Sequence, residues 1–522
     1  MAEKTITINQ IFGGHSASQY FGREGTYNTS IAIDPDLPIV STDVRTSGFA
    51  VPVGYSKFSG SNVNSAVIRI ITNPKTSLIY VVTTNGKLIS YTSAFGSETV
   101  LGTITGNAAT WAEYYNNYIY IFGPTDVARY GPLNGAATFT QTVWTGATLG
   151  SQTALTNTTY PTLRGVSIPN HMAHVHSDGA MYFCDFKDGQ GLIHKISTKK
   201  VTVEGDTNGT AVPSLYNALD LPFGFYPTVI ESYGSSLFIG GIYTVDTTIN
   251  QGSSAFVLWD PTDTVSFYLG PIPLPDPLLT AALNVGGNLY LWTGNSVNGV
   301  RLSSYGGGSS TTDIMYQEEG LPPLAGAVDA LGNRVVWGGF ATNPAAGAVV
   351  YAYGSKDARL PSGLHNVVKT SSSGSSPLTT ALKYVQQSSN VTPKVLPAWT
   401  DGSGSGIDQY STTATLGSVI RFMINVGMKF TITNIKIPLA GAVDSNTTIT
   451  PKLWFDDLSS SKTLTAINNT NFSGKRKIVY KGVDLQDSEA YNNAILELSW
   501  TGTNPIPVAF PITITLDIKE DE

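Results

Sequence analysis

The densest group of possible metal ligands in the sequence is the segment His171-Met172-Ala173-His174-Val175-His176, which holds three of the six histidines. On a β-strand alternate side chains face the same side, so His174 and His176 would lie next to each other. With Asp178 or Asp185 as a third ligand they could hold a divalent cation. The alternative is a strand of a repeat unit whose polar residues lie in a loop or at an interface. Since no third ligand is fixed, we predict no metal and no cofactor, and keep His174, His176 and Asp178 as candidate ligands.

Acidic residues also occur in close groups that could bind calcium or act as acid/base couples. These groups stand in turn-like sequence, where an aspartate usually caps backbone N–H groups. We therefore expect turn or loop roles for them. The groups are Asp34 and Asp36, Asp185 and Asp188, Asp456 and Asp457, and Glu318 and Glu319.

Motifs of the common enzyme classes are missing from the sequence. It has no Gly-x-Ser-x-Gly elbow, no His-Glu-x-x-His and no phosphate-binding Gly-Lys-Ser/Thr loop. The segment Thr400-Asp401-Gly402-Ser403-Gly404 is an echo of the sialidase Asp box, but it lacks the following tryptophan. Cys184 lies in an apolar strand, which favours a buried, inert thiol. We predict a protein that is not an enzyme, with no catalytic residues.

Aromatic residues could stack sugars, and one strand is rich in them. Tyr114, Tyr115, Tyr118 and Tyr120 stand close together in the sequence. An alternating aromatic strand more often forms core, so we give them a packing role.

Short apolar strands separated by polar turns carry all of these candidate residues. In the segment 235–262 one strand ends in Gly240-Gly241, a turn follows, and a second strand ends before Asp260-Pro261. The same unit recurs at intervals of 40 to 62 residues when it is aligned on its aromatic residue. Repeats of this size are typical of propeller blades, which stack in a ring to bury their faces. The aligned residues are Tyr80, Tyr120, Tyr182, Phe238, Tyr290 and Trp337.

This pattern predicts an all-β protein with a propeller of about seven blades, with six or five as alternatives, followed by a C-terminal β-sandwich. We expect an N-terminal arm over 1–60, the propeller over 61–412 and the sandwich over 413–522. Within the arm, Gly48–Val53 is a candidate strand that closes the ring. The loops Gly131–Ser167 and Lys199–Phe225 are expected to protrude, and Ser371–Ser376 is expected to be a flexible insertion in the last blade.

Composition and charge narrow the possible partners. A net charge of −7 argues against a nucleic-acid partner, which usually leaves a basic footprint. One cysteine excludes an internal disulfide framework. There is no secretory signal pattern and no apolar run long enough to span a membrane. We expect synthesis in a cytoplasm and no membrane span.

The arrangement of these parts resembles tail-associated structural proteins of tailed bacteriophages. The resemblance is carried by an arm, a propeller from about residue 60, and the closing segment Ala398–Gly402 with Gly406-Ile407-Asp408. The C-terminal segments 449–457, 498–503 and 511–512 add to it. The resemblance implies a virion component, located in the tail and made in the host cytoplasm. It further implies a homo-oligomer that contacts other tail proteins and a host surface receptor.

Two functions from different classes follow. The first is a structural tail protein that acts in assembly and host adsorption through protein or glycan contacts. The alternative is a glycan-binding or glycan-cleaving propeller that acts alone. The mass of the native assembly separates them, since only the first expects obligate partners.

Overall fold

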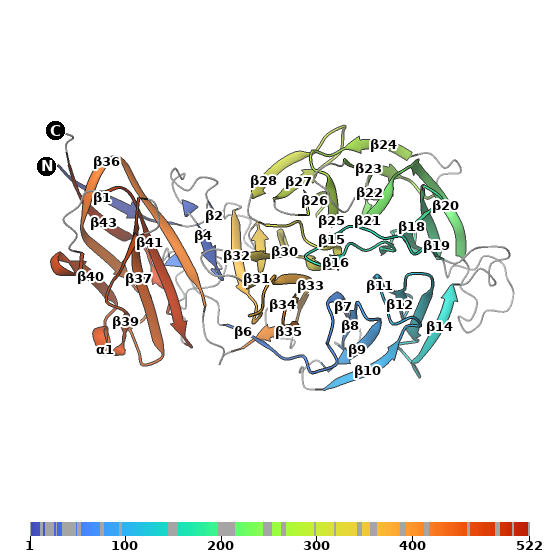
Figure 1. The fold of residues 1–522 in the computed structure, drawn as a ribbon, viewed down its shortest axis with the longest axis horizontal. Coiled ribbons are helices and arrows are strands. Elements are labelled where there is room, and N and C mark those ends of the chain that lie inside the picture. The colour runs from blue at the N-terminus through green and yellow to red at the C-terminus, as the bar shows by residue number, and fades with distance from the viewer. Residues whose placement is uncertain are drawn as a thin grey trace.

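Seven four-stranded antiparallel sheets form a closed β-propeller, and an additional nine-stranded sheet lies beside it (Figure 1). This is seen in a computed structural model. It describes residues 2–10, 14–15, 26–27, 29–33, 48–49, 54–73, 78–92, 97–144, 155–196, 214–243, 253–262, 268–296, 299–317, 320–341, 347–354, 363–386, 393–411, 417–456, 460–485, 491–503 and 506–519. The predicted all-β class and the seven-bladed propeller are confirmed.

The blades follow one another along the chain, each as a meander of four strands. Blade 1 has β7 (Val67–Thr72), β8 (Ile79–Thr83), β9 (Lys87–Tyr91) and β10 (Glu98–Thr103). Blade 2 has β11 (Trp111–Tyr115), β12 (Tyr118–Phe122), β13 (Val127–Gly131) and β14 (Thr138–Trp144). Blade 3 has β17 (Ala173–Val175), β18 (Met181–Lys187), β19 (Gln190–Ile196) and β20 (Ser214–Phe223). Blade 4 has β21 (Tyr226–Tyr233), β22 (Ser236–Ile242), β23 (Ser254–Trp259) and β24 (Tyr268–Pro273).

The last three blades keep the same order. Blade 5 has β25 (Leu278–Val285), β26 (Asn288–Gly294), β27 (Val300–Tyr305) and β28 (Thr312–Gln317). Blade 6 has β29 (Val328–Leu331), β30 (Arg334–Ala341), β31 (Gly347–Tyr353) and β32 (Leu364–Lys369). Blade 7 has β33 (Leu378–Val385), β34 (Lys394–Asp401) and β35 (Gly404–Tyr410), and takes its fourth strand, β6 (Tyr55–Lys57), from the N-terminal part of the chain.

The ring therefore closes by strand pairing between the two ends of the propeller sequence. Asp408, Gln409 and Tyr410 pair with Lys57, Ser56 and Tyr55. The sequence predicted such a closure but placed it at Gly48–Val53. Instead, β5 (Gly48–Phe49) pairs with β42 (Val508–Ala509) in the C-terminal region. The short segment 55–57 carries no apolar run, which is why the sequence pattern misplaced the closing strand.

The first strand of each blade packs against the first strands of its neighbours and so forms the inner wall of the ring. Aromatic residues bridge the blades at the positions that reveal the repeat in the sequence. Rings of Tyr80 and Tyr130 lie 6.3 Å apart, and those of Tyr182 and Trp259 lie 5.7 Å apart. Each pair joins two neighbouring blades, so the aromatic period reflects inter-blade packing.

The meander gives the ring two distinct faces. One face, called here the plug face, has the connections from the last strand of one blade to the first strand of the next. The far face has the turns between first and second and between third and fourth strands. Side chains near the end of an inner strand therefore lie towards the far face.

A hairpin covers the centre of the plug face. It consists of β15 (Thr162–Leu163) and β16 (Val166–Ser167), joined by Arg164 and Gly165 with φ of 49° and 83° (Figure 1). Together with Tyr160 and Ile168, Leu163 and Val166 are buried in a cluster with residues of blades 3 to 7. These are Phe186, Ile242, Leu278, Leu321, Leu324, Ala327, Phe340 and Leu378.

The hairpin corrects the expectation that Gly131–Ser167 protrudes. The described part of that segment forms β14 and then folds back over the ring, where the Arg164 guanidinium lies 3.3 Å from the centre of the Phe340 ring and donates to the Pro377 carbonyl at 2.9 Å. The apolar residues of this segment follow neither the spacing of a strand nor that of a helix, so the sequence pattern does not reveal this contact. In the second predicted loop, residues 214–223 form β20, and 199–213 lie outside the described residues.

Replacing Leu163 by alanine should lower the free energy of unfolding of the propeller by about 3 kcal/mol, because its side chain is fully buried among residues of several blades. Chemical denaturation followed by tryptophan fluorescence measures this. Ser167→Ala, on the same hairpin but exposed, is the matched control and should leave stability unchanged. Equal stability of both variants would show that the hairpin does not hold the ring together.

The serine-rich stretch 371–376 is held in place rather than being a flexible insertion. It connects blade 6 to blade 7 on the plug face. The carboxylate of Asp408 accepts from the backbone N–H and hydroxyl of Ser371, and Asp401 accepts from the N–H groups of Ser373 and Gly374. The five donors around Asp401 lower the pKa of its carboxyl, although burial opposes them. The low sequence complexity of this stretch therefore reflects the role of its backbone, whose N–H groups bind carboxylates.

The C-terminal sheet is built around one long, bent strand, β36 (Val419–Pro438). Its first half pairs with β41 (Tyr491–Gly502), and its second half pairs with β43 (Ile512–Ile518) and β40 (Lys477–Lys481). Both halves bury their apolar side chains in one core. Further elements of this region are β37 (Thr447–Phe455), β38 (Ser460–Thr463), β39 (Ile467–Asn468), α1 (Asn469–Phe472) and η2 (Gly482–Leu485), whereas η1 (Ala325–Ala327) directly precedes β29 of blade 6.

The described N-terminal residues do not form an arm that leaves the body. Strand β1 (Ala2–Ile8) pairs with β43 along its whole length, and β4 (Thr29–Ile31) pairs with β36. The remaining short strands are β2 (Gly14–His15) and β3 (Thr26–Tyr27), which pair in parallel. The partner that the expected arm requires is therefore the C-terminal sheet of the same chain.

The same N-terminal residues join the two parts of the molecule. The Tyr27 hydroxyl lies 2.8 Å from His365 Nδ1 on β32, and the Ile33 N–H donates to the Asn366 carbonyl at 2.8 Å. Strand β4 thus lies between the C-terminal sheet and blade 6 (Figure 1). Within the described ranges, the helices are too short for any of them to cross a bilayer.

Candidate functional site

Two of the three candidate metal ligands meet at one serine of the neighbouring blade. His174 lies on the inner strand β17, and His176 follows it directly. His174 Nε2 and His176 Nδ1 each lie 2.9 Å from the hydroxyl of Ser232 on β21, and His176 Nε2 lies 3.0 Å from the Ser235 carbonyl. The strand thus places the two histidines as predicted, but their shared partner is a hydroxyl.

The third candidate, Asp178, takes part in a different set of contacts. Its carboxylate accepts from the Ala180 N–H at 2.9 Å, the Tyr182 hydroxyl at 2.7 Å and Lys195 Nζ at 3.2 Å. These donors lower the pKa of Asp178 against the effect of burial. The three candidates are therefore not brought together, and no group of three His, Cys, Asp or Glu residues suited to a metal occurs in the described ranges.

His174 instead belongs to a polar network along the inner wall of blades 1 to 4. Arg69 pairs with Glu113 at 3.1 Å, and His174 Nε2 lies 3.3 Å from the Glu231 carboxylate. The four side chains are 26%, 15%, 23% and 14% exposed, in the order Arg69, Glu113, His174 and Glu231. The network is half-buried, so its side chains are in contact both with solvent and with the interior of the protein.

Burial shifts the pKa values of Glu231 and His174 in opposite directions. It raises the pKa of Glu231 to about 7, although the Ser232 N–H and Arg69 oppose this. It lowers the pKa of His174 to about 4, although Glu113 opposes this. Desolvation disfavours the charged form of each group. Near neutral pH the histidine is therefore neutral, and the glutamic acid titrates.

The hydrogen bonds around the two histidines define a direction for their protons. His176 Nε2 donates to the Ser235 carbonyl, and in the tautomer with its proton on Nε2 the ring accepts from the Ser232 hydroxyl at Nδ1. Ser232 then accepts from His174 Nε2–H. This series of hydrogen bonds links His176, Ser232 and His174 and so connects blade 3 to blade 4.

A second charged pair lies on the inner wall of blades 6 and 7. Lys383 Nζ lies 3.0 Å from Asp329 Oδ1, and the Tyr384 N–H donates to the same carboxylate at 2.7 Å. Glu113, Glu231, Asp329 and Lys383 each stand two residues before the end of their inner strand. Together they place a ring of charged side chains towards the far face.

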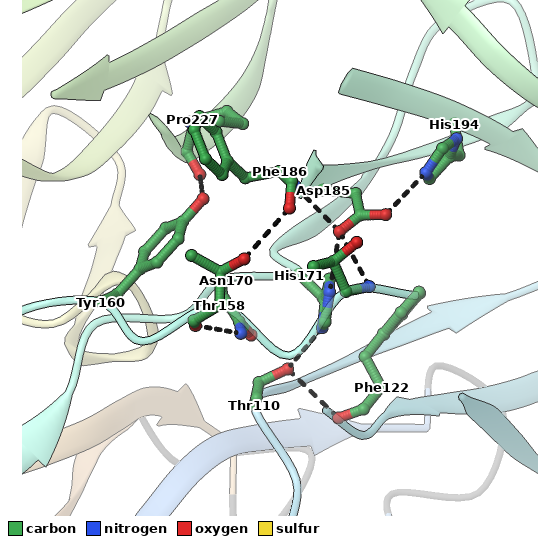
Figure 2. A network of polar contacts seen from close by, with 11 residues as sticks. Thr110, Phe122, Thr158, Tyr160, Asn170, His171, Asp185, Phe186, His194 and Pro227 are labelled. Atoms are coloured by element: carbon green, nitrogen blue, oxygen red, sulfur yellow. Dashed lines mark hydrogen bonds and ion pairs between the residues drawn. The ribbon is translucent and has the colours of Figure 1, made fainter. Parts of the chain in front are cut away.

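Asp185 lies in a separate network that is sealed from solvent (Figure 2). Its carboxylate accepts from the Phe186 and Thr156 N–H groups, at 2.8 and 3.3 Å, and lies 3.3 Å from His171 Nε2 and 3.1 Å from His194 Nε2. The side chains of Asp185 and both histidines have no exposed area. The histidine contacts hold the pKa of Asp185 well below its usual range despite burial.

The hydrogen bonding of His194 identifies this network as structural. The backbone N–H of Asn217 donates to His194 Nδ1 at 2.9 Å, so that nitrogen carries no proton. The proton of the neutral ring is therefore on Nε2, which donates to Asp185 and is not available as a metal ligand. Since residues 155–171 lead into the plug hairpin and to β17, the network fastens this crossing segment to blade 3.

The remaining candidates have local roles where they are described. Asp188 lies exposed in a turn with φ of 52°, and Asp456 accepts from the N–H groups of Asn492 and Asn493. Cys184 is fully buried, and burial raises the pKa of its thiol. The residues Asp34, Asp36, Glu318, Glu319 and Asp457 lie outside the described residues.

The aromatic strand is partly core and partly surface. Tyr115 and Tyr120 are buried, as expected for packing, while Tyr114 and Tyr118 are half-buried. Arg129 lies 4.7 Å from the centre of the Tyr118 ring.

Glu231 and Ser232 escape the sequence analysis because they lie more than 50 residues from the histidines that they contact. One signal could have found them. Charged residues recur at the same distance before the first turn of blades 2, 4, 6 and 7, and an alignment of blades on that turn brings them into one column.

Comparison with known proteins finds distant structural likenesses. Neither protein-family models nor curated proteins match the sequence. Solved structures that are similar include the extracellular domain of a hybrid two-component system from B. thetaiotaomicron, at 11% identity and a TM-score of 0.45. That match covers 89% of this chain, and the chain spans 60% of the length of that structure.

Two further similar structures differ in function. A WD40 domain from Neurospora crassa matches at 9% identity over 69% of this chain and 94% of its own, with a TM-score of 0.39. A family 43 arabinoxylan arabinofuranohydrolase from Bacillus subtilis matches at 11% identity over 86% of this chain and 95% of its own, with a TM-score of 0.28. At these values the likenesses carry no argument about function.

Proposed function

We propose that this chain is a structural protein of a tailed-bacteriophage virion, located in the tail, which acts in tail assembly and host adsorption through contact surfaces. On this proposal it is made in the host cytoplasm, forms homo-oligomers and binds other tail proteins. The sequence resemblance supports the class, and the way in which the N-terminal segment joins the two parts of the molecule supports the mechanical role.

The observation that carries the proposal is this joining. Within residues 2–57, β1 and β4 complete the C-terminal sheet, and β6 closes the propeller. Because Ile33, two residues after β4, donates to the Asn366 carbonyl of blade 6, one segment is hydrogen-bonded to both parts. Such a segment keeps two contact surfaces at a fixed spacing, which is a property that a structural component needs.

The test is particle composition in the phage that encodes the chain. Mass spectrometry of purified virions should find the chain at a constant ratio to the major tail protein. A gene deletion should give particles with incomplete tails, and expression in trans should restore them. The His174→Gln variant should incorporate like the wild type, because contact surfaces are proposed to act and not the inner-wall network. Virions that lack the chain would refute the proposal.

A glycan-binding or glycan-cleaving propeller that acts alone is the second candidate. One observation favours it: two carboxyl groups of the inner wall differ in environment, since Glu231 has a pKa of about 7 and Glu113 pairs with Arg69. A protonated and an ionised carboxyl are the groups that glycoside hydrolysis uses. Hydrolysis of a glycan panel that is lost in Glu231→Gln, by a monomer in solution, would favour this candidate.

A further inference from the structure

Exposed lysines lie along the outer side of strand β40 in the C-terminal sheet. The alternate residues Ile478 and Tyr480 are fully buried in the core of the sheet. Lys477 and Lys481 are exposed. Since alternate side chains of a strand face opposite sides, both lysines point away from the core. Strand β40 lies at the end of the molecule away from the propeller, where no other part of the ring approaches it (Figure 1).

The neighbouring strand adds a third lysine on the same side. Lys436 of β36 is directly opposite Val479, the residue midway between Lys477 and Lys481. Its diagonal neighbours are therefore these two lysines, at the roughly 7–8 Å that separates such positions in an antiparallel pair. Three amines thus share a small area of the sheet, and like charges at this spacing repel one another.

The turn that leads into β40 contributes two further cations. Lys475 and Arg476 are exposed and directly precede β40. Their backbone is held in place, because the N–H groups of Leu439 and Val443 donate to the carbonyls of Arg476 and Lys475 at 2.7 and 3.1 Å. The five cations are called here the basic strip. They are Lys436, Lys475, Arg476, Lys477 and Lys481.

The basic strip is not neutralised by carboxylates in the part of the C-terminal sheet that the structure describes. The ion pairs there are Arg421 with Glu497 and Lys519 with Asp517, and neither includes a member of the strip. The whole chain nevertheless carries a net charge of −7. Five cations gathered without anionic partners create a local positive potential, which attracts a negatively charged ligand.

The surroundings of the strip favour one class of polyanion. Protein interfaces are depleted in lysine and rich in aromatic residues, whereas the outward positions of β40 carry Lys477, Val479 and Lys481. Single-stranded nucleic acids stack on aromatic rings, but Tyr480 is buried. A polysaccharide with anionic groups needs charged donors and hydroxyls. The lysines supply the first, and Thr513, opposite Lys436 on β43, supplies the second.

We propose that the basic strip binds an anionic polysaccharide, one whose repeat unit carries a phosphate, sulfate or carboxylate group. The amines of the strip donate charge-assisted hydrogen bonds to these groups. Because several amines lie side by side, successive repeat units bind at once, and weak single contacts add up to firm attachment. The inference rests on the proposed role in host contact and names the chemistry of the receptor.

The test is titration calorimetry of the full chain with four polymers at one salt concentration: dextran sulfate, uncharged dextran, duplex DNA and polyglutamate. The wild type should bind dextran sulfate most tightly and should not bind dextran. Its Kd should rise steeply with salt, because the amines displace counterions. Lys477→Gln/Lys481→Gln should bind dextran sulfate at least tenfold more weakly and with a shallower dependence on salt. Its melting temperature should not fall, because it removes repulsion and no core contact.

Lys4→Gln/Lys429→Gln is the matched control, since it removes the same charge from two exposed lysines outside the strip. Lys4 is opposite the buried Leu516, so it lies on the other side of the sheet. This variant should bind dextran sulfate like the wild type.

Three results would each overturn the inference. They are no binding of dextran sulfate, tighter binding of DNA or polyglutamate, and equal weakening by both double variants. A chain that is present in virions but fails this test leaves the proposed function standing, so the two failures are distinguishable.

Discussion

Replacing Asp185 by alanine should lower the free energy of unfolding by about 3–5 kcal/mol, because it removes one partner of a fully buried charged network. Two backbone N–H groups and two imidazole N–H groups lose their acceptor, and both imidazoles have no exposed area. The plug segment should also become more open to proteolysis, since this network fastens it to blade 3.

Asp188→Asn is the matched control for this experiment. Asp188 lies three residues further along the same blade, is exposed, and has a positive φ that asparagine tolerates. Its stability should equal that of the wild type. If Asp185→Ala unfolds at the same denaturant concentration as this control, the buried network does not hold the segment.

The pair His174–Glu231 should show opposite dependences on pH when either member is removed. The raised pKa of Glu231, about 7 against 4.5, gives stability that is complete below pH 4.5 and is lost as pH rises through 7. The lowered pKa of His174, about 4 against 6.5, gives stability that is complete above pH 6.5 and is lost as pH falls through 4. Between pH 4.5 and 6.5 the folded and unfolded pairs each hold one proton, so the two effects cancel.

Single variants should remove this cancellation. Relative to the wild type, Glu231→Gln should lose about 3 kcal/mol of stability as pH falls from 6.5 to 4, and His174→Gln should lose about 3 kcal/mol as pH rises from 4.5 to 7. Denaturation of both variants and the wild type over this range gives the differences. Differences that do not change with pH, or that have the reverse slopes, would contradict the assigned protonation states.

Much of the propeller could be predicted because its repeat is a local feature of the sequence. Residues such as Tyr80, Tyr182 and Trp337 fall at blade-sized intervals, since each packs against a neighbouring blade. The closing strand β6 and the hairpin β15–β16 could not be predicted in the same way. Both are short, and their partners lie hundreds of residues away or on several blades at once.

The candidate site likewise has a part that the sequence predicts and a part that it does not. The alternation of a strand correctly brings His174 and His176 to one side, because that property belongs to the local backbone. Their partners Glu231 and Ser232 come from the next blade. Asp178, which follows the histidines in the sequence, turns instead to Lys195 within its own blade.

Electron cryomicroscopy of intact virions tests the central claim most directly, because it detects the chain, its location and its neighbours at once. The tail should contain several copies of a seven-bladed ring with the C-terminal sheet beside blade 6, each in contact with other tail proteins. A tail in which no density fits this two-part shape, in particles whose genome encodes the chain, would contradict the account.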